Sequence, residues 1–176
     1  MTGFQPGIPQ PGEYNPFYET YIGKSRAFAD PVHKLKEQHD EVLSLFRHLD
    51  SQKQLFRYAP GKWSAKEVLG HLIDAERVMT YRAMRIARGD QTPLPGFDEN
   101  TYVAEAQTEH CDWNELLEEF SHVRHATILL FRHIPQEAWL RTGTANGAPL
   151  SVRALAYIVA GHTAHHLTIL RERYLT

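Results

Sequence analysis

Cysteine is almost missing from this sequence of 176 residues, whose one thiol belongs to Cys111. A single cysteine excludes a disulfide within the chain and every zinc motif built on cysteine ligands. Any bound metal ion would therefore need histidine and carboxylate ligands. The absence of a disulfide framework also favours a reducing compartment.

The sequence also has no excess of positive charge and no long apolar run. Lys and Arg number 19 against 21 Asp and Glu, and the formal net charge at pH 7 is −2. This balance provides no basic field, so we expect no nucleic-acid partner. No stretch reaches the length of a membrane span, and the first residues lack the charged start and apolar core of a signal peptide. We therefore expect no membrane partner and a cytoplasmic protein.

The remaining composition is typical of a globular protein, with 42% hydrophobic and 23% charged residues. A chain of this length is right for one core, so we predict a single domain over residues 1–176. Residues 1–29 are rich in Pro, Gly and Tyr. We interpret them as an extended N-terminal arm packed on the domain, ending in a short helix, with disorder of residues 1–12 as the alternative.

Four segments show helical spacing of apolar residues together with helix start signals. Asp30 before Pro31 and the Ser64–Glu67 capping box are two of these signals. The predicted helices cover residues 31 to about 50, 65 to about 88, 113 to about 133, and 152 to about 174. No sizeable segment has strand periodicity, although residues 136–150 are irregular or hairpin-like. The pattern predicts an all-α four-helix bundle.

Residues 91–111 form a long connection between the second and third predicted helices. Neighbouring helices of a bundle are usually joined by fewer residues, so we expect a crossover between helices that run parallel. Long ordered loops also tend to cover functional sites. Under that second interpretation, Asn100 and Tyr102 are candidates to line a pocket.

Histidine is concentrated near the C-terminus, at positions 162, 165 and 166. On a helix, His162 and His166 lie on consecutive turns of one apolar stripe, and His165 lies on its flank. Two imidazoles spaced in this way can bind a single metal ion. The alternative is that each packs in the core with its own hydrogen-bond partner. His165 is then either a pocket residue or a rim residue.

Other histidines could complete such a site. His71 lies on the shoulder of the second helix's apolar stripe, and periodicity alone does not single it out. His122 and His125, three residues apart on the third helix, form a weaker rival pair. A further ligand from elsewhere in the chain would decide between a metal site and histidine packing.

Several motifs, taken together, resemble the DinB/YfiT-like superfamily of metalloenzymes. They are Pro60–Ser64, Gly70–Asp74, the Pro93–Tyr102 loop and Gly161–Leu167, and the Glu13–Tyr18 segment also resembles the start of such proteins. The resemblance implies a four-helix bundle that binds zinc or nickel through three histidines. Carried over to this sequence, the metal ligands are His71, His162 and His166.

The resemblance further implies a small-molecule substrate, a homodimer and a metal that activates water or a thiol. Relatives act as hydrolases, as S-transferases that use a low-molecular-weight thiol such as bacillithiol or mycothiol, or as thiol-dependent isomerases. A hydrolase needs a general base, and the carboxylates nearest to His71 in sequence are Asp74 and Glu76. We expect Asp74 to support a ligand or lie on the surface, and Glu76 could form a pair on the helix surface. The alternatives are a non-catalytic, stress-related module that binds a metal or small ligand, and a structural bundle.

Overall fold

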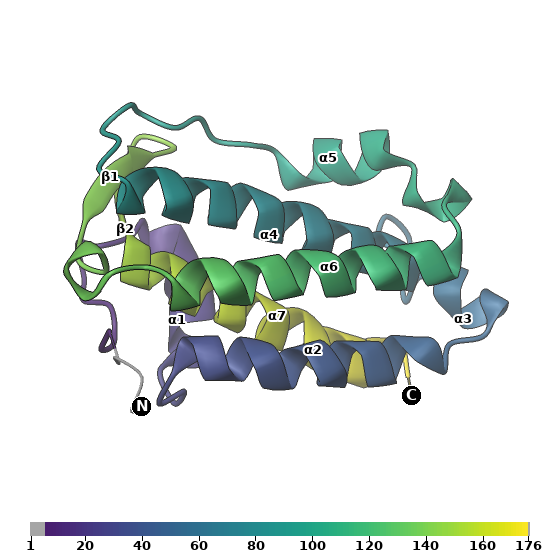
Figure 1. Ribbon diagram of the computed structural model, residues 1–176. Helices are drawn as coiled ribbons and strands as arrows, with labels where there is room; N and C mark the ends of the chain where they lie inside the picture. Colours follow the sequence, from purple (N-terminus) through teal and green to yellow (C-terminus); the bar gives the residue numbers. More distant parts are fainter. Residues whose placement is uncertain (1–5, 176) are drawn as a thin grey trace.

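The computed structural model describes residues 6–175, and the expectations for residues 1–5 of the arm lie outside this range. Four long helices form a bundle, α2 (Pro31–Arg47), α4 (Ala65–Ala87), α6 (Trp113–Arg132) and α7 (Val152–Arg173) (Figure 1). The predicted all-α four-helix bundle is therefore confirmed. Within residues 6–175, none of the helices has the length and hydropathy needed to cross a membrane.

The helix starts follow from the capping residues. The Asp30 side chain accepts a hydrogen bond from the Val32 amide, and the Ser64–Glu67 capping box is fully formed. The predicted helix ends agree less well with the structure than the predicted starts do. Helix α2 stops at Arg47, whereas the sequence predicted an end near Asp50. Asp50 instead caps a separate short helix, α3 (Ser51–Leu55), by accepting from the Lys53 amide at 2.9 Å.

The connection between α4 and α6 carries the chain back along the bundle to the end at which α4 began (Figure 1). Both helices run the same way in Figure 1, and α2 and α7 run the opposite way. The predicted crossover between parallel helices is therefore confirmed. It is not a plain loop, because it contains α5 (Glu99–Ala106) and the short 3-10 helix η2 (Thr108–His110). Asp98 caps α5 by accepting from the Thr101 amide at 2.7 Å.

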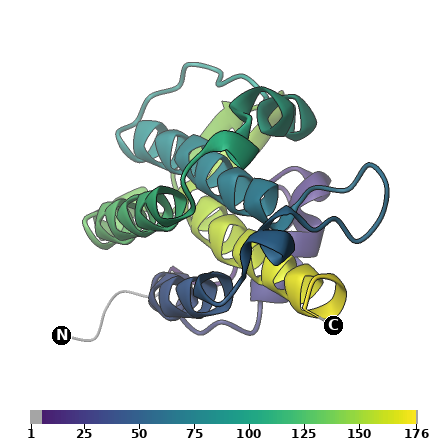
Figure 2. The same cartoon turned by 90° about the vertical axis from the view of Figure 1, so that its right-hand side faces the viewer.

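Helix α7 lies at the centre of the fold, as the end-on view in Figure 2 shows. Nearly every residue between Val152 and Gly161 is buried. The sequence predicted one buried apolar stripe along this helix, whereas the structure buries the helix on more than one side. The additional cover comes from the N-terminal arm. Its helix α1 (Glu19–Ser25), preceded by the 3-10 turn η1 (Pro16–Tyr18), packs along α7.

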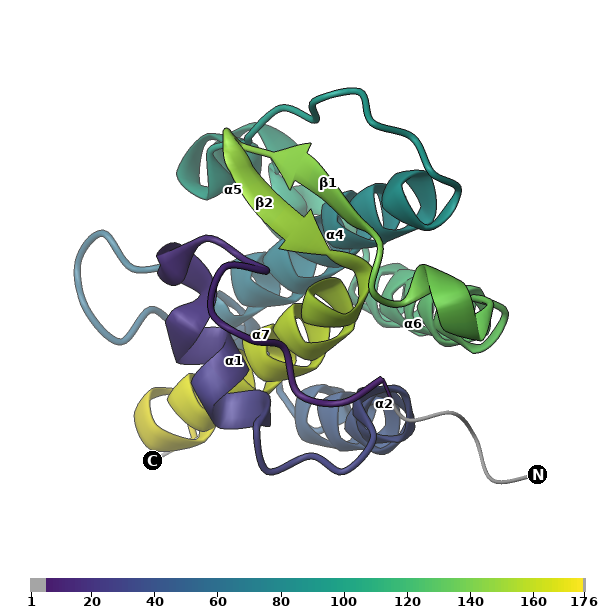
Figure 3. The same cartoon turned by 90° about the vertical axis from the view of Figure 1, so that its left-hand side faces the viewer.

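A β-hairpin covers one end of the bundle (Figure 3). Strands β1 (Thr142–Ala145) and β2 (Ala148–Ser151) pair antiparallel around Asn146 and Gly147, which both have positive φ angles of 50° and 72°. An Asn-Gly pair with this backbone is the favoured two-residue hairpin turn. The hairpin follows the short 3-10 helix η3 (Gln136–Ala138). The hairpin-like segment expected between residues 136 and 150 is thus present.

Candidate metal centre

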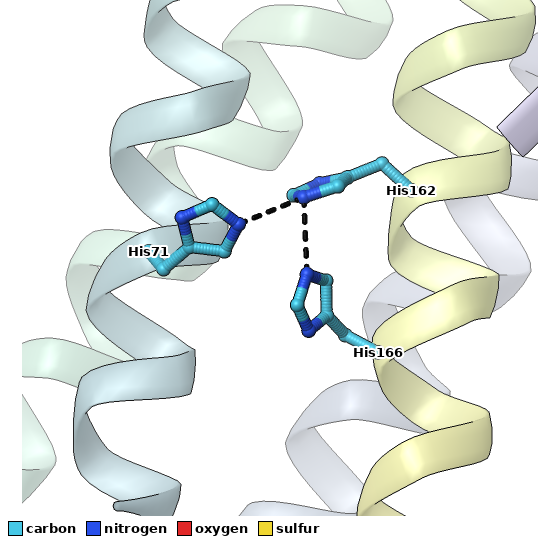
Figure 4. Close-up of side chains that lie close together, drawn as sticks. All are labelled: His71, His162 and His166. Carbon is cyan, nitrogen blue, oxygen red and sulfur yellow. Dashed lines mark hydrogen bonds between the residues drawn. The ribbon is translucent and has the colours of Figure 1, made fainter. Parts of the chain in front are cut away.

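Three histidine side chains from two helices meet inside the bundle (Figure 4). His71 comes from α4, and His162 and His166 come from consecutive turns of α7. The Nε2 atom of His162 lies 2.9 Å from Nε2 of His71 and 3.1 Å from Nε2 of His166. Among residues 6–175, these three form the only cluster of at least three His, Cys, Asp or Glu side chains close enough to share an ion.

All three imidazoles are held in the neutral form. Burial lowers the pKa of His71 from 6.5 to about 4, with a smaller contribution from the charge of His165. Burial also holds the pKa values of His162 and His166 well below 6.5, and the neighbouring histidines add to the effect. A neutral imidazole is the form that binds a metal, so all three histidines can act as metal ligands at neutral pH.

The contacts among the three rings suit a shared ion better than mutual hydrogen bonds. A neutral imidazole offers one N–H donor and one acceptor nitrogen. Nε2 of His162 faces two other Nε2 atoms, and whichever role it takes, it has only one proton or one lone pair for both. A tetrahedral ion with metal–nitrogen distances of about 2.0–2.1 Å places its nitrogen ligands about 3.3 Å apart. The two separations from His162 are close to this value, and the ligand atoms of all three residues lie within 4.8 Å of one another. The three residues therefore fit a divalent metal.

Aromatic rings surround the histidines and restrict their orientation. The Trp63 ring lies 4.7 Å from the His71 ring and 6.4 Å from the His166 ring, between centroids. Tyr21 of α1 packs edge-on against His162 at 5.1 Å. These contacts limit the positions that the imidazoles can take, which is what a preorganised metal site requires.

A cavity of about 350 Å³ reaches the histidine cluster from the side of the crossover and the hairpin. Its wall includes His71 and His162, Tyr18 and Tyr21 of the N-terminal arm, and residues of α4, the crossover and the hairpin turn. The arm is thus part of the site. Burial raises the pKa of Tyr21 to about 12, with smaller contributions from Glu99 and Tyr18, so this phenol stays protonated.

The two carboxylates nearest to His71 in sequence have different environments. Glu76 is buried and accepts hydrogen bonds from Arg124 of α6, so the expected pair on the helix surface is wrong. Asp74 is partly exposed and lies 3.7 Å from the guanidinium of Arg77. Burial raises the pKa of Asp74, against the opposing effect of Arg77. Asp74 is therefore near the surface, one of the two positions expected for it.

The remaining candidates divide between the site and the surface. Asn100 lines the cavity, whereas Tyr102 is 44% exposed and packs its ring against Phe97. His165 is half-buried beside Tyr21, with ring centroids 5.5 Å apart. The rival pair, His122 and His125, is exposed on α6 and away from the cluster.

Four side chains in or next to the site were not identified as functional residues from the sequence. Trp63 and Tyr21 carry no periodic signal, because one precedes a helix and the other belongs to the arm. Arg124 and Arg82 are charged residues, which are normally exposed, yet they are 0% and 2% exposed. A useful signal for Arg124 would have been its position on the buried side of α6, between Phe120 and Thr127.

A search with protein-family models finds that residues 34–170 match the model described as the DinB superfamily. The match covers most of the chain, so the protein belongs to the DinB superfamily.

Its structure is similar to that of YfiT from Bacillus subtilis, described as a probable metal-dependent hydrolase with an unusual four-helix bundle topology. The TM-score is 0.74 at 14% sequence identity, over 97% of this chain and 91% of that chain. At this identity, the similarity shows a shared fold. No curated protein matches the sequence.

Proposed function

We propose that this protein is a metal-dependent enzyme of the DinB/YfiT-like type, with His71, His162 and His166 as the metal ligands. The convergence of three neutral imidazoles beside a cavity is the observation that carries the proposal. YfiT, which shares the fold, is described as a probable metal-dependent hydrolase, and this description supports the same class of reaction here.

We propose zinc or nickel as the metal, because both accept imidazole ligands readily. A divalent ion bound by three neutral imidazoles keeps a position open for water or substrate and lowers the pKa of the group bound there. The chain supplies the ligand set, and its cavity of about 350 Å³ has room for a small-molecule substrate. The Tyr21 and Trp63 rings keep the imidazoles in place.

Among the carboxylates that line the cavity, Glu99 is the candidate to accept a proton during hydrolysis. Three carboxylates line the cavity, from Glu76, Asp98 and Glu99. Glu76 is engaged by Arg124, and Asp98 caps α5. Burial raises the pKa of Glu99, and the charge of Asp98 raises it further. A raised pKa brings a carboxylate closer to the range in which it can act as a general base near neutral pH.

Transfer of a low-molecular-weight thiol is a second candidate reaction, favoured by the engagement of Glu76. A thiol is acidic enough to ionise at a metal without a strong base, and the nucleophile is then the thiolate. Cys111 is exposed and absent from the cavity wall, so this chemistry does not involve the protein's own thiol. The cosubstrate would have to supply the sulfur.

Activity of the metal-loaded protein tests the proposal. A panel of esters and amides examines hydrolysis, and an epoxide or haloarene with and without added thiols examines transfer. The His162→Ala variant is the control, because any turnover that depends on the site must fall with it. A protein that binds one metal per chain and turns over none of these substrates would instead support the alternative of a non-catalytic, stress-related binding module.

A homodimer and a cytoplasmic location stay predictions. The homodimer follows from the family resemblance and is tested by the mass of the protein in solution. The location follows from the scarcity of cysteine, and is tested by fractionating the source cells.

A further inference from the structure

Arg82 is a buried guanidinium in the wall of the cavity that reaches the histidines. It lies eleven residues after His71 on α4, which places it on the same face of the helix, three turns and about 16 Å further along. Its exposure is 2%, although it lines the cavity. The two residues therefore border one chamber at different depths.

Among the described residues, the hydrogen-bond and ring contacts of Arg82 are all with neutral groups. One guanidinium nitrogen donates to the Pro95 carbonyl at 2.7 Å. The other lies 3.4 Å from the Tyr18 hydroxyl and 3.7 Å from the Met79 sulfur, and the group lies 5.7 Å from the centre of the Phe97 ring. Within residues 6–175, Arg82 has no carboxylate oxygen within 4.0 Å, so its charge has no ion-pair partner there.

Arg124 shows how the same fold treats a buried arginine that needs only structural compensation. It is equally buried, and the Glu76 carboxylate accepts its hydrogen bonds at 2.8–3.1 Å. A buried charge without an opposite charge is costly, so buried charges are normally paired. The absence of such a partner for Arg82, in a position open to a cavity, indicates that a ligand supplies the opposite charge.

The other acidic groups of the cavity do not take this role. Glu76 is already neutralised by Arg124, and Asp98 accepts from the Thr101 amide as the cap of α5. Glu99 borders the cavity but forms no ion pair with Arg82. A guanidinium with free N–H groups binds carboxylate and phosphate oxyanions through two parallel hydrogen bonds. The space beside Arg82 therefore suits an oxyanion.

We propose that Arg82 binds the carboxylate or phosphate group of the substrate and thereby selects small organic anions. Apolar side chains between the two ends, including Met79, Phe97 and Ile158, line the cavity and would contact the body of such a molecule. The position of the reacting group at the histidines depends on the proposed function. The anion site itself does not, because Arg82 needs no metal to bind an oxyanion.

Binding of three probes, measured by titration calorimetry, tests the inference. Phenylacetate and phenyl phosphate carry the two oxyanions, and phenylacetamide is the neutral counterpart of phenylacetate. The measurement uses the zinc-loaded protein and the His166→Ala variant prepared without metal, in which no anion can bind to a metal ion. At least one anion should bind this variant about tenfold or more tightly than phenylacetamide, and the tighter of the two identifies the oxyanion.

Arg82→Gln should abolish this preference, and Arg77→Gln should keep it, because Arg77 is on the exposed side of the same helix. Circular dichroism checks the folding of each variant, and the comparison of probes on His166→Ala stands even where Arg82→Gln does not fold. Equal affinity for the anions and phenylacetamide, or an unchanged preference in folded Arg82→Gln, would overturn the inference.

An anion preference without metal binding or turnover would refute the proposed function alone. Metal-dependent turnover without an anion preference would refute only the role of Arg82.

Discussion

Arg124 and Glu76 form a fully buried ion pair that connects α6 to α4, with N–O distances of 2.8–3.1 Å. The same guanidinium donates to the Leu35 carbonyl of α2 at 3.1 Å and to the Thr163 hydroxyl of α7 at 2.9 Å. One side chain thus joins all four long helices. Thr163 follows His162 directly, so the pair also fixes the part of α7 that carries the histidines.

Replacing Arg124 with Met should strongly destabilise the protein. The change leaves the buried Glu76 carboxylate without its partner, and losses of about 3–5 kcal/mol are typical when one member of a buried pair is removed. Urea denaturation measures the free energy of unfolding. Arg77→Met is the matched control, because the exposed pair of Arg77 and Glu119 should contribute about 1 kcal/mol or less. Similar losses in the two variants would show that the buried pair has no special importance.

Gly161→Ala should also destabilise the protein, because α1 lies too close to α7 at this point for a larger residue. A Cβ atom at position 161 would be 2.0 Å from the Tyr21 carbonyl oxygen, so α1 would have to move. Overpacking of this kind costs about 1–3 kcal/mol. The shift would also disturb the contact of Tyr21 with His162 and lower metal affinity.

Gly23→Ala is the control for this prediction. Gly23 is a helical residue of α1, and no atom of the other residues between 6 and 175 lies within 4 Å of an added Cβ there. This substitution should stabilise the protein by about 0.5–1 kcal/mol, since alanine favours the helix. Thermal unfolding of the two variants distinguishes the effects. If Gly161→Ala were as stable as Gly23→Ala, the close approach of α1 would not matter.

The metal-free protein should lose stability as the pH falls from 6.5 to about 4. The pKa of His71 is about 4 in the folded state against 6.5 for an unperturbed histidine. Between these values the unfolded chain binds a proton that the folded chain does not, so acid favours unfolding. His71 alone accounts for a loss on the order of 3 kcal/mol, which is complete at about pH 4.

Urea titrations of the metal-free protein at pH 7, 6 and 5 measure this loss. The His71→Gln variant should show a smaller decrease over the same range, because it lacks one of the titrating groups. Carboxylates affect both proteins alike and cancel in the comparison. An identical pH dependence in wild type and His71→Gln would mean that the folded protein does not resist protonation of His71.

The fold was predictable because it depends on local signals. The Asp30–Pro31 start, the Ser64–Glu67 box and the periodic apolar residues each act within a few positions of the chain. The predicted buried face of α7 is smaller than the observed one, because the N-terminal arm covers a second side of that helix. That contact joins Tyr21 and Gly161, which are far apart in sequence, and helical periodicity does not record it.

The candidate site was predictable in part, and the reason is again the distance between residues along the chain. The spacing of His162 and His166 indicated that they could bind one metal ion together, because both lie on the same face of one helix. His71 required the family resemblance, since only the packing of α4 on α7 brings it to the cluster. Arg82 had no signal in the sequence, because a buried arginine facing a cavity has the same local pattern as an exposed one.

Metal content and affinity, compared among single-histidine variants, test the central claim most directly. Elemental analysis should find one zinc or nickel ion per chain in the wild type. His71→Ala, His162→Ala and His166→Ala should each lower metal affinity by at least about 100-fold, more than the 10–100-fold typical of residues that only support a ligand. His165→Ala should lower it about tenfold at most, because His165 lies beside Tyr21 and outside the triad. A wild type that binds no metal, or equal losses in all four variants, would contradict the assignment.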